Sequence, residues 1–502
     1  MYTFSNKLKT FAFVLMALGL LGIAYGFLTA PKTTQDVEKI LAESHHDGGH
    51  HTAATAHEVA PATEAHHEVA DTVAHEAPKS EAHTVAADSV KTVEADSTKA
   101  VVAPVAEENH HDAHAAKADT HEADAHKEHE KHLEHVLHQL QNKPWAALYV
   151  ACIFFLLISM GVLVFYAIQW AAQAGWSPVL FRVMEGITAY LLPGSIIFFV
   201  LLVLSGMHMN HLFAWMAEGV TDPKSENYDA IIAGKAGFLN VPFFLIRAAV
   251  FLAGWNLYRY FSRKNSLAQD DATDDSFYKK NFKMAAGFLA FFIVTESIAS
   301  WDWVMSVDPH WYSTLFGWYV FASFFVSGIT TIAFVTLYLK SKGYLEYVNT
   351  SHIHDLAKFM FGISVFWTYL WFSQFMLMWY SNIPEEVTYF VTRIEDFKLP
   401  FFGMVVMNFV LPILILINTD FKRLTWVVVM AGIIILTGHY IDFFNMIMPA
   451  TVGDQWFIGV SEISALLFFF GLFIFVVFTA LTKSPLLAKR NPLIEESKHF
   501  HY

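Results

Sequence analysis

The chain has 502 residues, of which 55% are hydrophobic and 16% are aromatic. This composition is typical of an integral membrane protein with a polar insert, and it excludes an ordinary soluble domain. The formal charge of -14 comes largely from acidic residues outside the apolar runs. The sequence has no basic stripe of the kind that binds nucleic acid. The single cysteine, Cys152, excludes an internal disulfide and an iron–sulfur cluster held by this chain alone.

The first segment, residues 1–30, begins with basic residues and continues into an apolar run from Phe11 to Ala30. That run holds about 20 apolar residues, which is just long enough to span a membrane. A charged start followed by an apolar core is also how a signal peptide begins. The run is long for a signal peptide, and Leu28-Thr29-Ala30 is a poor cleavage site. We therefore interpret residues 1–30 as an uncleaved transmembrane anchor.

The second segment, residues 31–143, is rich in Ala, His, Glu, Thr, Asp and Val. It nearly lacks large aliphatic and aromatic side chains, so it cannot bury enough apolar surface to offset its chain entropy. We predict a flexible, acidic, His-rich extracytoplasmic segment without a fixed metal-ligand spacing. Apolar residues at helical spacing over 126–141 predict a short amphipathic helix that leads into the membrane.

After Pro144 the sequence alternates between long apolar runs and short polar loops. Runs of this length predict membrane-spanning helices, and with the anchor they make about ten in an all-α integral membrane fold. The predicted spans are about 145–169, 179–206, 237–258, 284–305, 312–339, 357–380, 400–418, 424–446 and 456–482.

Lysine and arginine residues concentrate in every second loop and in both terminal segments. Such loops face the cytoplasm, so both termini are expected there and residues 31–143 on the outer side. The opposite short loops contain few basic residues, which are Lys224, Lys235, Arg393 and Lys398.

The second to fifth and the sixth to ninth spans can be overlaid in the same orientation. The third span of each set starts with Pro-Phe-Phe, at 242–244 and 400–402. In the fourth span of each set an aspartate, Asp302 or Asp442, precedes a proline by the same distance. A parallel repeat of this kind places corresponding sites at the same membrane face. The predicted domains are the anchor 1–30, the segment 31–143, a first four-helix bundle 144–306, a second four-helix bundle 307–449, and a last helix with a cytoplasmic tail 450–502.

Ionisable residues occur within the predicted spans, where each charge costs roughly 2.5–3.5 kcal/mol at mid-depth unless it has a partner. His439 and Asp442 are three residues apart and share a helix face, so the carboxylate can orient the imidazole. Such a pair near the outer face can accept the protons released when a quinol is oxidised. The alternative is a buried pair that holds two helices together. The candidate proton acceptors or relay residues are His439, Asp442, Asp302 and Glu296.

Arg247 stands near the middle of its span and needs a carboxylate, for which Glu296 on the following helix is the expected partner. The pair is either a structural salt bridge or part of a proton relay. Glu185 lies one turn from Arg182 near the cytoplasmic end. This spacing favours a local ion pair between the two residues over a role for Glu185 at the entrance of a proton pathway. The residues that could form a proton path are Arg247, Glu185 and Glu462.

Tryptophans near the outer face form an aromatic belt in many membrane proteins. Here they stand beside acids and histidines, so they are also candidate walls for a flat quinone ring. The spans contain too few histidines for the facing axial ligands of b-type haems, and no metal site is predicted. If the protein takes part in electron transfer, its redox centres are therefore expected in other subunits. The candidate quinone-binding residues are His208, Trp301, Trp303 and Gln374.

Five stretches of the sequence resemble a known family, the NrfD/polysulfide-reductase-like integral membrane subunits. Within it, the chain is most similar to the F subunits of alternative complex III, a bacterial quinol:cytochrome c oxidoreductase. The resemblance covers roughly residues 144–483 and leaves out the His-rich segment. The stretches are SGMHMNHLFAWMAEG, NVPFFLIRA, ESIASWDWVMSVDPHWYSTLFGWYVF, FSQFMLMWYSNIPEE and TGHYIDFF.

This resemblance implies a bacterial cytoplasmic (inner) membrane complex that oxidises quinol, such as menaquinol, at its periplasmic face. Electrons would pass through an iron–sulfur protein and c-type cytochrome subunits to cytochrome c or an attached terminal oxidase. A sister NrfD-like subunit would lie alongside and hold the better-supported quinol site. The chain itself would bind no covalent cofactor, with quinone as its only expected ligand besides membrane lipid, and would contribute scaffolding and a proton path.

Two other functions fit parts of the sequence. A proton-coupled secondary transporter would also explain ionisable residues within the spans. Carriers usually place their sites at mid-membrane between inverted repeats, whereas this repeat is parallel and its polar residues lie towards one face. The other alternative is a purely structural anchor subunit, whose buried polar residues only determine helix packing.

Overall fold

The computed structural model describes residues 1–47 and 112–501, with side chains for 1–42 and 129–501, and this part of the chain is helical without strands. Ten of its helical segments are long and apolar enough to cross a membrane, so the chain is a multi-pass integral membrane protein. The predicted all-α fold with ten spans is confirmed. The spans are Asn6–Thr29, His129–Ala171, Pro178–Gly206, Val241–Gln269, Ser276–Val307, Phe316–Ser341, Thr350–Ser381, Lys398–Leu416, Thr425–Gln455 and Val460–Leu481.

The predicted flexible segment 31–143 falls partly on residues 48–111, which lie outside the described residues. On either side of them the chain is helical, in α2 (Thr34–Asp47) and in the first part of α3 (Asp112–Ala171). The short helix expected over 126–141 is part of α3, which continues through Pro144. Residues 38–131 form one unit, and residues 1–37 and 132–502 form the other, which we call the helical body.

By position in the chain we divide the helices of the body into a first group, α3 to α8, and a second group, α9 to α14, and α8 packs against α9 between them. In the first, α7 packs against α5 and α8; in the second, α9 packs against α10 and α14, and α12 and α13 pack against α14. The predicted similarity of the two groups stays a prediction. The helices after α3 are α4 (Phe181–Ile187), α5 (Leu191–Gly206), α6 (Ala230–Lys235), α7 (Val241–Gln269), α8 (Ser276–Trp303), α9 (Phe316–Ser341), α10 (Thr350–Ser381), α11 (Pro384–Glu395), α12 (Lys398–Val405), α13 (Leu411–Leu416), α14 (Thr425–Val452), α15 (Val460–Leu481) and α16 (Ile494–Lys498).

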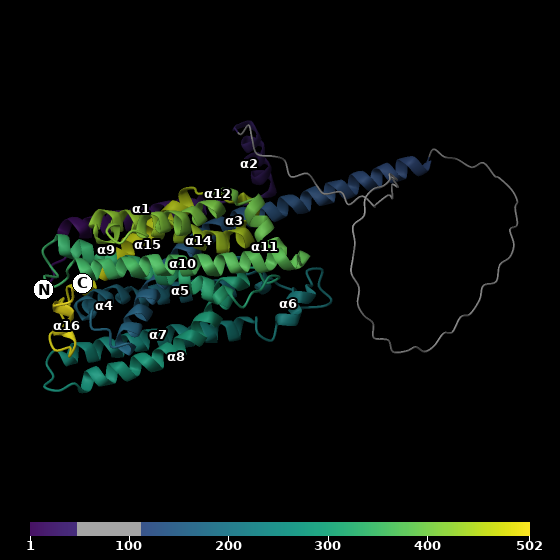
Figure 1. Cartoon of the computed structure of the whole chain (residues 1–502). Coiled ribbons are helices and arrows are strands. Elements are labelled where there is room, and N and C mark those ends of the chain that lie inside the picture. The colour runs from purple at the N-terminus through teal and green to yellow at the C-terminus, as the bar shows by residue number, and fades with distance from the viewer. Residues whose placement is uncertain (48–111, 502) are drawn as a thin grey trace, which may run out of the picture. The chain divides into compact units, whose positions relative to one another are not determined.

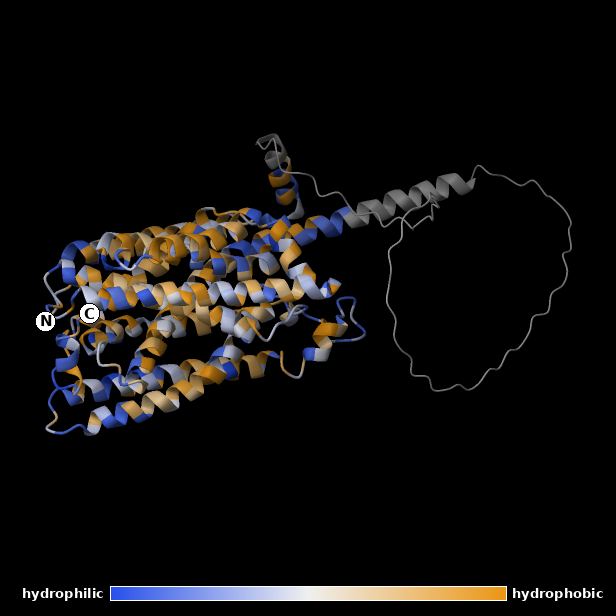
Figure 2. Ribbon diagram, viewed as in Figure 1, coloured by the Kyte–Doolittle hydropathy of each residue, from blue (hydrophilic) through white to orange (hydrophobic). Residues whose placement is uncertain are grey.

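Both chain termini lie at the same end of the helical body, as an even number of spans requires (Figure 1). The short helices α6 and α11 lie at the opposite end, which we call the far end. Hydrophobic residues occupy the middle of the body and hydrophilic residues gather at its two ends (Figure 2). This banding is what a membrane with an apolar core about 30 Å thick selects.

The most deeply buried spans are those of α3 and α9, which cross in the centre of the body. In these two, 94% and 89% of the apolar window is buried, whereas no other span exceeds 56%. Gly161 and Gly328 form the crossing. A Cβ atom on Gly328 would lie 2.8 Å from the nitrogen of Val162 and 2.9 Å from the carbonyl carbon of Gly161. Small residues of this kind let two membrane helices approach backbone to backbone.

We expect Gly328→Ala to destabilise the protein by about 1–3 kcal/mol, because the new methyl group would meet backbone that cannot move aside. Gly362 on α10 is the matched control, since a Cβ atom there meets nothing within 4 Å. Thermal unfolding of the detergent-purified variants measures the difference. Equal unfolding temperatures for Gly328→Ala and Gly362→Ala would contradict the close crossing.

The N-terminal helix α1 packs along α15 through a row of glycines, Gly19, Gly22 and Gly26. A Cβ atom on Gly19 would lie 2.5 Å from the backbone nitrogen of Phe468. A row of small residues at this spacing is a common membrane-helix contact. The first span is therefore held in the helical body by specific packing.

The C-terminal tail packs across the end that carries the termini. The hydroxyl of Ser497 donates to the carbonyl of Trp176 at 2.6 Å and accepts from the amide of Val179 at 3.2 Å. The carbonyl of Ser497 lies 3.1 Å from Nε2 of His352 at the start of α10. Because these partners come from both groups of helices, the tail joins the two groups at this end.

Candidate functional site

A buried polar cluster of the second group surrounds Asp442 on α14. The carboxylate is fully buried, and its Oδ1 accepts a hydrogen bond from the hydroxyl of Tyr319 on α9. Its Oδ2 accepts from the indole Nε1 of Trp367 on α10 at 2.8 Å. Three helices therefore converge on one carboxylate, and both of its oxygens are hydrogen-bonded. We call Tyr319, Trp367, His439 and Asp442 the Asp442 cluster.

His439 lies one turn before Asp442 on the same face of α14, as the sequence predicted. Its Nδ1 is 3.5 Å from Oδ2 of Asp442 and 2.9 Å from the hydroxyl of Ser323. Its Nε2 is buried and has no hydrogen-bond partner among the described side chains and backbone. The imidazole is thus oriented on one side by Asp442 and Ser323 and is open to a further partner on the other. This geometry suits proton exchange, and it also suits packing.

The cluster lies well inside the helical body. Val452 ends α14 at the far end, and at 1.5 Å per residue about 15 Å of helix separates it from Asp442. Asp302, by contrast, is the penultimate residue of α8. Pro449 lies within α14 whereas Pro309 lies in a loop, so the equal aspartate-to-proline spacings lead to different surroundings.

A buried arginine, Arg393, lies near this cluster on the short helix α11, although the sequence analysis counted it among loop residues. Its Nε donates to the carbonyl of Asn445 at 3.0 Å and its Nη1 to the carbonyl of Tyr389 at 2.8 Å. The guanidinium stacks on the ring of Tyr389 at 3.4 Å, and that ring stacks on Trp311 at 4.0 Å. Among the described side chains, no carboxylate lies within ion-pair distance of Arg393.

Sequence reasoning missed Arg393 because it treated residues 381–399 as an outer loop. The signal that could have found it is the amphipathic pattern of α11, in which the apolar residues Tyr389 and Phe390 face inwards with Arg393 one turn later. Tyr319 and Asn445 were also missed. Asn445 follows Asp442 by three residues on α14, so the helical spacing could have indicated it, whereas nothing local distinguishes Tyr319 from the other polar residues of α9.

A small cavity of about 10 Å³ adjoins the cluster, and we call it the Arg393 cavity. Gln374, a predicted quinone-binding residue, lines it together with Tyr319 and Arg393. This volume is far below the roughly 300–1,000 Å³ of typical ligand pockets, so a quinone ring does not fit in it. The cavity is lined by Tyr319, Trp371, Gln374, Tyr389, Phe390, Arg393, Phe401, Met404, Asn445 and Met446.

The first group has its own buried ion pair, and its partner differs from the expected one. Arg247 on α7 binds Asp302 on α8, not Glu296, with Nε–Oδ2 at 2.7 Å and Nη2–Oδ1 at 2.8 Å. Its Nη1 and Nη2 also donate to the carbonyl of Phe238 at 3.1 Å. The predicted Arg247–Glu296 pair is wrong because Glu296 lies about 1.7 turns before Asp302 on α8, so the two carboxylates face different neighbours.

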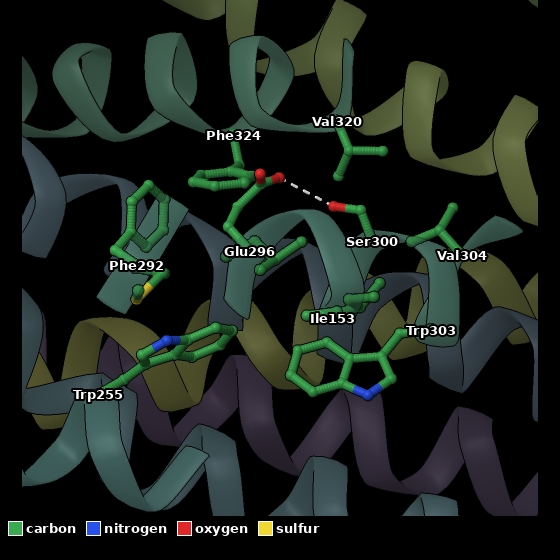
Figure 3. Close-up of a pocket in the computed structure, with 12 residues that line it drawn as sticks. Ile153, Trp255, Phe292, Glu296, Ser300, Trp303, Val304, Val320 and Phe324 are labelled. Atoms are coloured by element: carbon green, nitrogen blue, oxygen red, sulfur yellow. Dashed lines mark hydrogen bonds between the residues drawn. The ribbon is translucent and has the colours of Figure 1, made fainter. Parts of the chain in front are cut away.

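Glu296 instead lines a second cavity of about 10 Å³ between α3, α7, α8 and α9 (Figure 3). Its Oε1 accepts from the hydroxyl of Ser300 at 2.9 Å and its Oε2 from that of Ser297 at 3.4 Å. Trp303, a predicted quinone-binding residue, lines the same cavity with Trp255. We call it the Glu296 cavity. The carboxyl group of Glu296 has hydroxyl partners and no ion-pair partner among the described residues.

The remaining predicted residues lie apart from the Asp442 cluster. His208 is exposed beyond the end of α5 with φ at 58°, and Trp301 is half-buried on α8. Glu185 lies at the end of the helical body that carries the termini. It binds Arg182 at 2.8 Å, so the predicted local ion pair is confirmed, and it accepts a hydrogen bond from the hydroxyl of Tyr166 at 2.9 Å. Glu462 accepts from the amide of Gly459 at 2.8 Å and caps the start of α15.

Loops at the far end of the first group are held together by polar contacts. Oδ2 of Asp229 lies 2.6 Å from Nε2 of His310, and Nζ of Lys235 donates to the carbonyl of Pro309 at 2.5 Å. The hydrogen bond from His310, with help from backbone amides of α6, lowers the pKa of Asp229. These contacts dock α6 on the loop that follows α8.

Within the described residues, no group of three or more His, Cys, Asp or Glu side chains is arranged to hold a metal ion. No family model and no curated protein matches the chain. The site must therefore be interpreted from its own geometry.

Proposed function

We propose that this chain is a cofactor-free membrane subunit of a respiratory quinol:cytochrome c oxidoreductase. It would be of the NrfD/polysulfide-reductase-like type, corresponding to the F subunit of alternative complex III. The observation that carries the proposal is the Asp442 cluster, in which a buried carboxylate is surrounded by a tyrosine, a tryptophan and a histidine. Ionisable groups at this depth in a membrane protein mark proton or substrate pathways by default.

Oxidation of a quinol releases protons, and a site that supports it needs groups that accept them. His439 has a nitrogen without a protein partner, and Asp442 lies 3.5 Å from its other nitrogen. The imidazole could take a proton, and the carboxylate would stabilise the resulting cation. The far end would then be the periplasmic side of a bacterial inner membrane, since the loops there contain the fewest basic residues.

The cavities beside Asp442 and Glu296 are each too small for a quinol, so these two places support a contribution to proton transfer and not quinol binding. Electrons would pass through partner subunits, namely an iron–sulfur protein and c-type cytochromes, to cytochrome c or a terminal oxidase. A sister NrfD-like subunit would provide most of the quinol site. Menaquinol or another quinol would be the substrate of the assembly.

The alternative of a structural anchor subunit is favoured by one observation in the first group. Arg247 and Asp302 satisfy each other with two hydrogen bonds, and Arg247 further binds the carbonyl of Phe238. An ion pair whose members satisfy each other in this way holds α7 against α8 and leaves neither side chain free to exchange a proton. The first group would then serve packing, while the second serves proton chemistry.

Purification of the tagged chain in a mild detergent, followed by mass spectrometry, tests the proposal. We expect iron–sulfur and c-type cytochrome subunits and a second NrfD-like chain to co-purify, and the preparation to reduce cytochrome c with quinol. A tagged unrelated multi-span protein from the same membranes is the control for non-specific association. A chain that purifies alone, with proton-coupled solute uptake in vesicles, would contradict the proposal and support the transporter.

A further inference from the structure

The Arg393 cavity contains two buried polar atoms without a protein partner, and they are complementary. Nε2 of Gln374 is a donor and Oδ1 of Asn445 is an acceptor, and both residues line the cavity. Gln374 is 4% exposed and Asn445 is 2% exposed, so neither amide reaches bulk water. A buried amide left without a hydrogen bond costs about 1–3 kcal/mol, so each of these two atoms needs a partner.

We infer that the Arg393 cavity is a binding site for one water molecule, held between Gln374 and Asn445. The cavity has a volume of about 10 Å³, which is about what a single water requires. A water also needs two to four polar partners. Gln374 would donate to its oxygen, and one of its hydrogens would go to Oδ1 of Asn445.

The second hydrogen of this water has a natural acceptor in Tyr319, which lines the same cavity. The hydroxyl of Tyr319 donates its own hydrogen to Asp442, so its oxygen is left to accept. The water would therefore hold the hydroxyl of Tyr319 with its hydrogen directed at Asp442. Neighbouring hydrogen bonds of this kind polarise and strengthen one another. The nearby cation of Arg393 favours a neutral water over a hydronium ion.

The Glu296 cavity has nearly the same volume and provides an internal comparison. It is lined almost entirely by apolar side chains, with Glu296 and Ser300 as its polar groups, and these two already bind each other. The indole nitrogen of Trp303 lies on the edge of the ring that points away from the carboxyl group (Figure 3). The Glu296 carboxyl group already has two hydroxyl partners, so this cavity lacks the pair of unpaired polar groups that would hold a water. Volume alone therefore does not define the water site; the complementary amides do.

This inference deepens the proposed function, because the water would position a residue of the Asp442 cluster. A structure of the purified complex at a resolution that shows ordered water tests it directly. We expect one density peak within hydrogen-bond distance of Nε2 of Gln374 and Oδ1 of Asn445, and none in the Glu296 cavity. An Arg393 cavity without density, or amides that bond each other instead, would overturn the inference.

A double-mutant cycle of Gln374→Leu and Asn445→Leu tests the same point in solution. If one water links the two amides, either substitution removes the link, so the double variant should lose little more thermal stability than the worse single variant. Fully additive losses would overturn the inference. As a matched control, Gln374→Leu should combine additively with Ser300→Ala in the Glu296 cavity. Neither readout depends on turnover, so a failed water site and a failed reductase assignment can be told apart.

Discussion

Asp442→Asn should leave the protein assembled in its membrane complex and should lower quinol:cytochrome c reductase turnover by about 10²-fold or more, the range expected when a general acid or base is lost. The carboxylate accepts hydrogen bonds from Tyr319 and from Trp367 on its two oxygens. An asparagine has only one oxygen, so its amide group must face one of these two donors. The variant therefore removes the charge and also disturbs the orientation of the cluster.

The combination of Asp442→Asn with His439→Gln should lower turnover no further than Asp442→Asn alone, because the two residues act as one unit. Glu226→Gln is the control, since it removes an exposed carboxylate from the far-end loop between α5 and α6, outside the cluster. Assembly is checked on a native gel and turnover with a soluble quinol. Unchanged turnover in an assembled complex would mean that the cluster serves packing, and the quinol chemistry would then have to lie in a sister subunit.

Arg247→Met should destabilise the protein by about 3–5 kcal/mol, because it leaves the buried carboxylate of Asp302 without its cation. Asp302→Asn should have a similar effect, since it leaves the guanidinium of Arg247 unpaired. The double variant should recover most of the loss, because it removes both charges together. This pattern distinguishes a buried pair that holds α7 to α8 from two independent functional groups.

Thermal unfolding of the detergent-purified variants measures these differences. If the double variant loses as much as the two single variants together, the pair does not act as a unit and the clamp between α7 and α8 is refuted. If the variants unfold at the wild-type temperature but have lower reductase turnover, Arg247 and Asp302 would instead be assigned to the proton pathway.

The second group shows how far local spacing predicts a site. His439 and Asp442 were predicted to share a helix face because residues three apart always do so on a helix, and the structure confirms it. The hydrogen-bond donors to Asp442 were not predicted. Trp367 and Tyr319 are separated from it by 75 and 123 residues, and their contact depends on how α9, α10 and α14 pack.

Arg247 and Arg393 show the same limit for charges. The sequence predicted Glu296 as the carboxylate partner of Arg247. The rotation of α8 about its axis instead places Asp302 on Arg247 and Glu296 in the Glu296 cavity. Arg393 was expected in a loop, whereas α11 packs against α14 and buries it, with its guanidinium stacked on Tyr389 of the same helix. The rotation of α8 and the packing of the short helix α11 therefore determine which polar side chains come into contact.

The sequence by itself determined that the chain is an all-helical membrane protein with ten spans. Hydropathy over about 20 consecutive residues is a local property, and the membrane core requires every backbone polar group to be paired within its own helix. Only the tertiary structure decided which polar side chains meet, which of them are buried, and where the two small cavities lie. Those contacts depend on the rotation and separation of helices far apart in the chain, and side-chain packing, rather than local pattern, sets both.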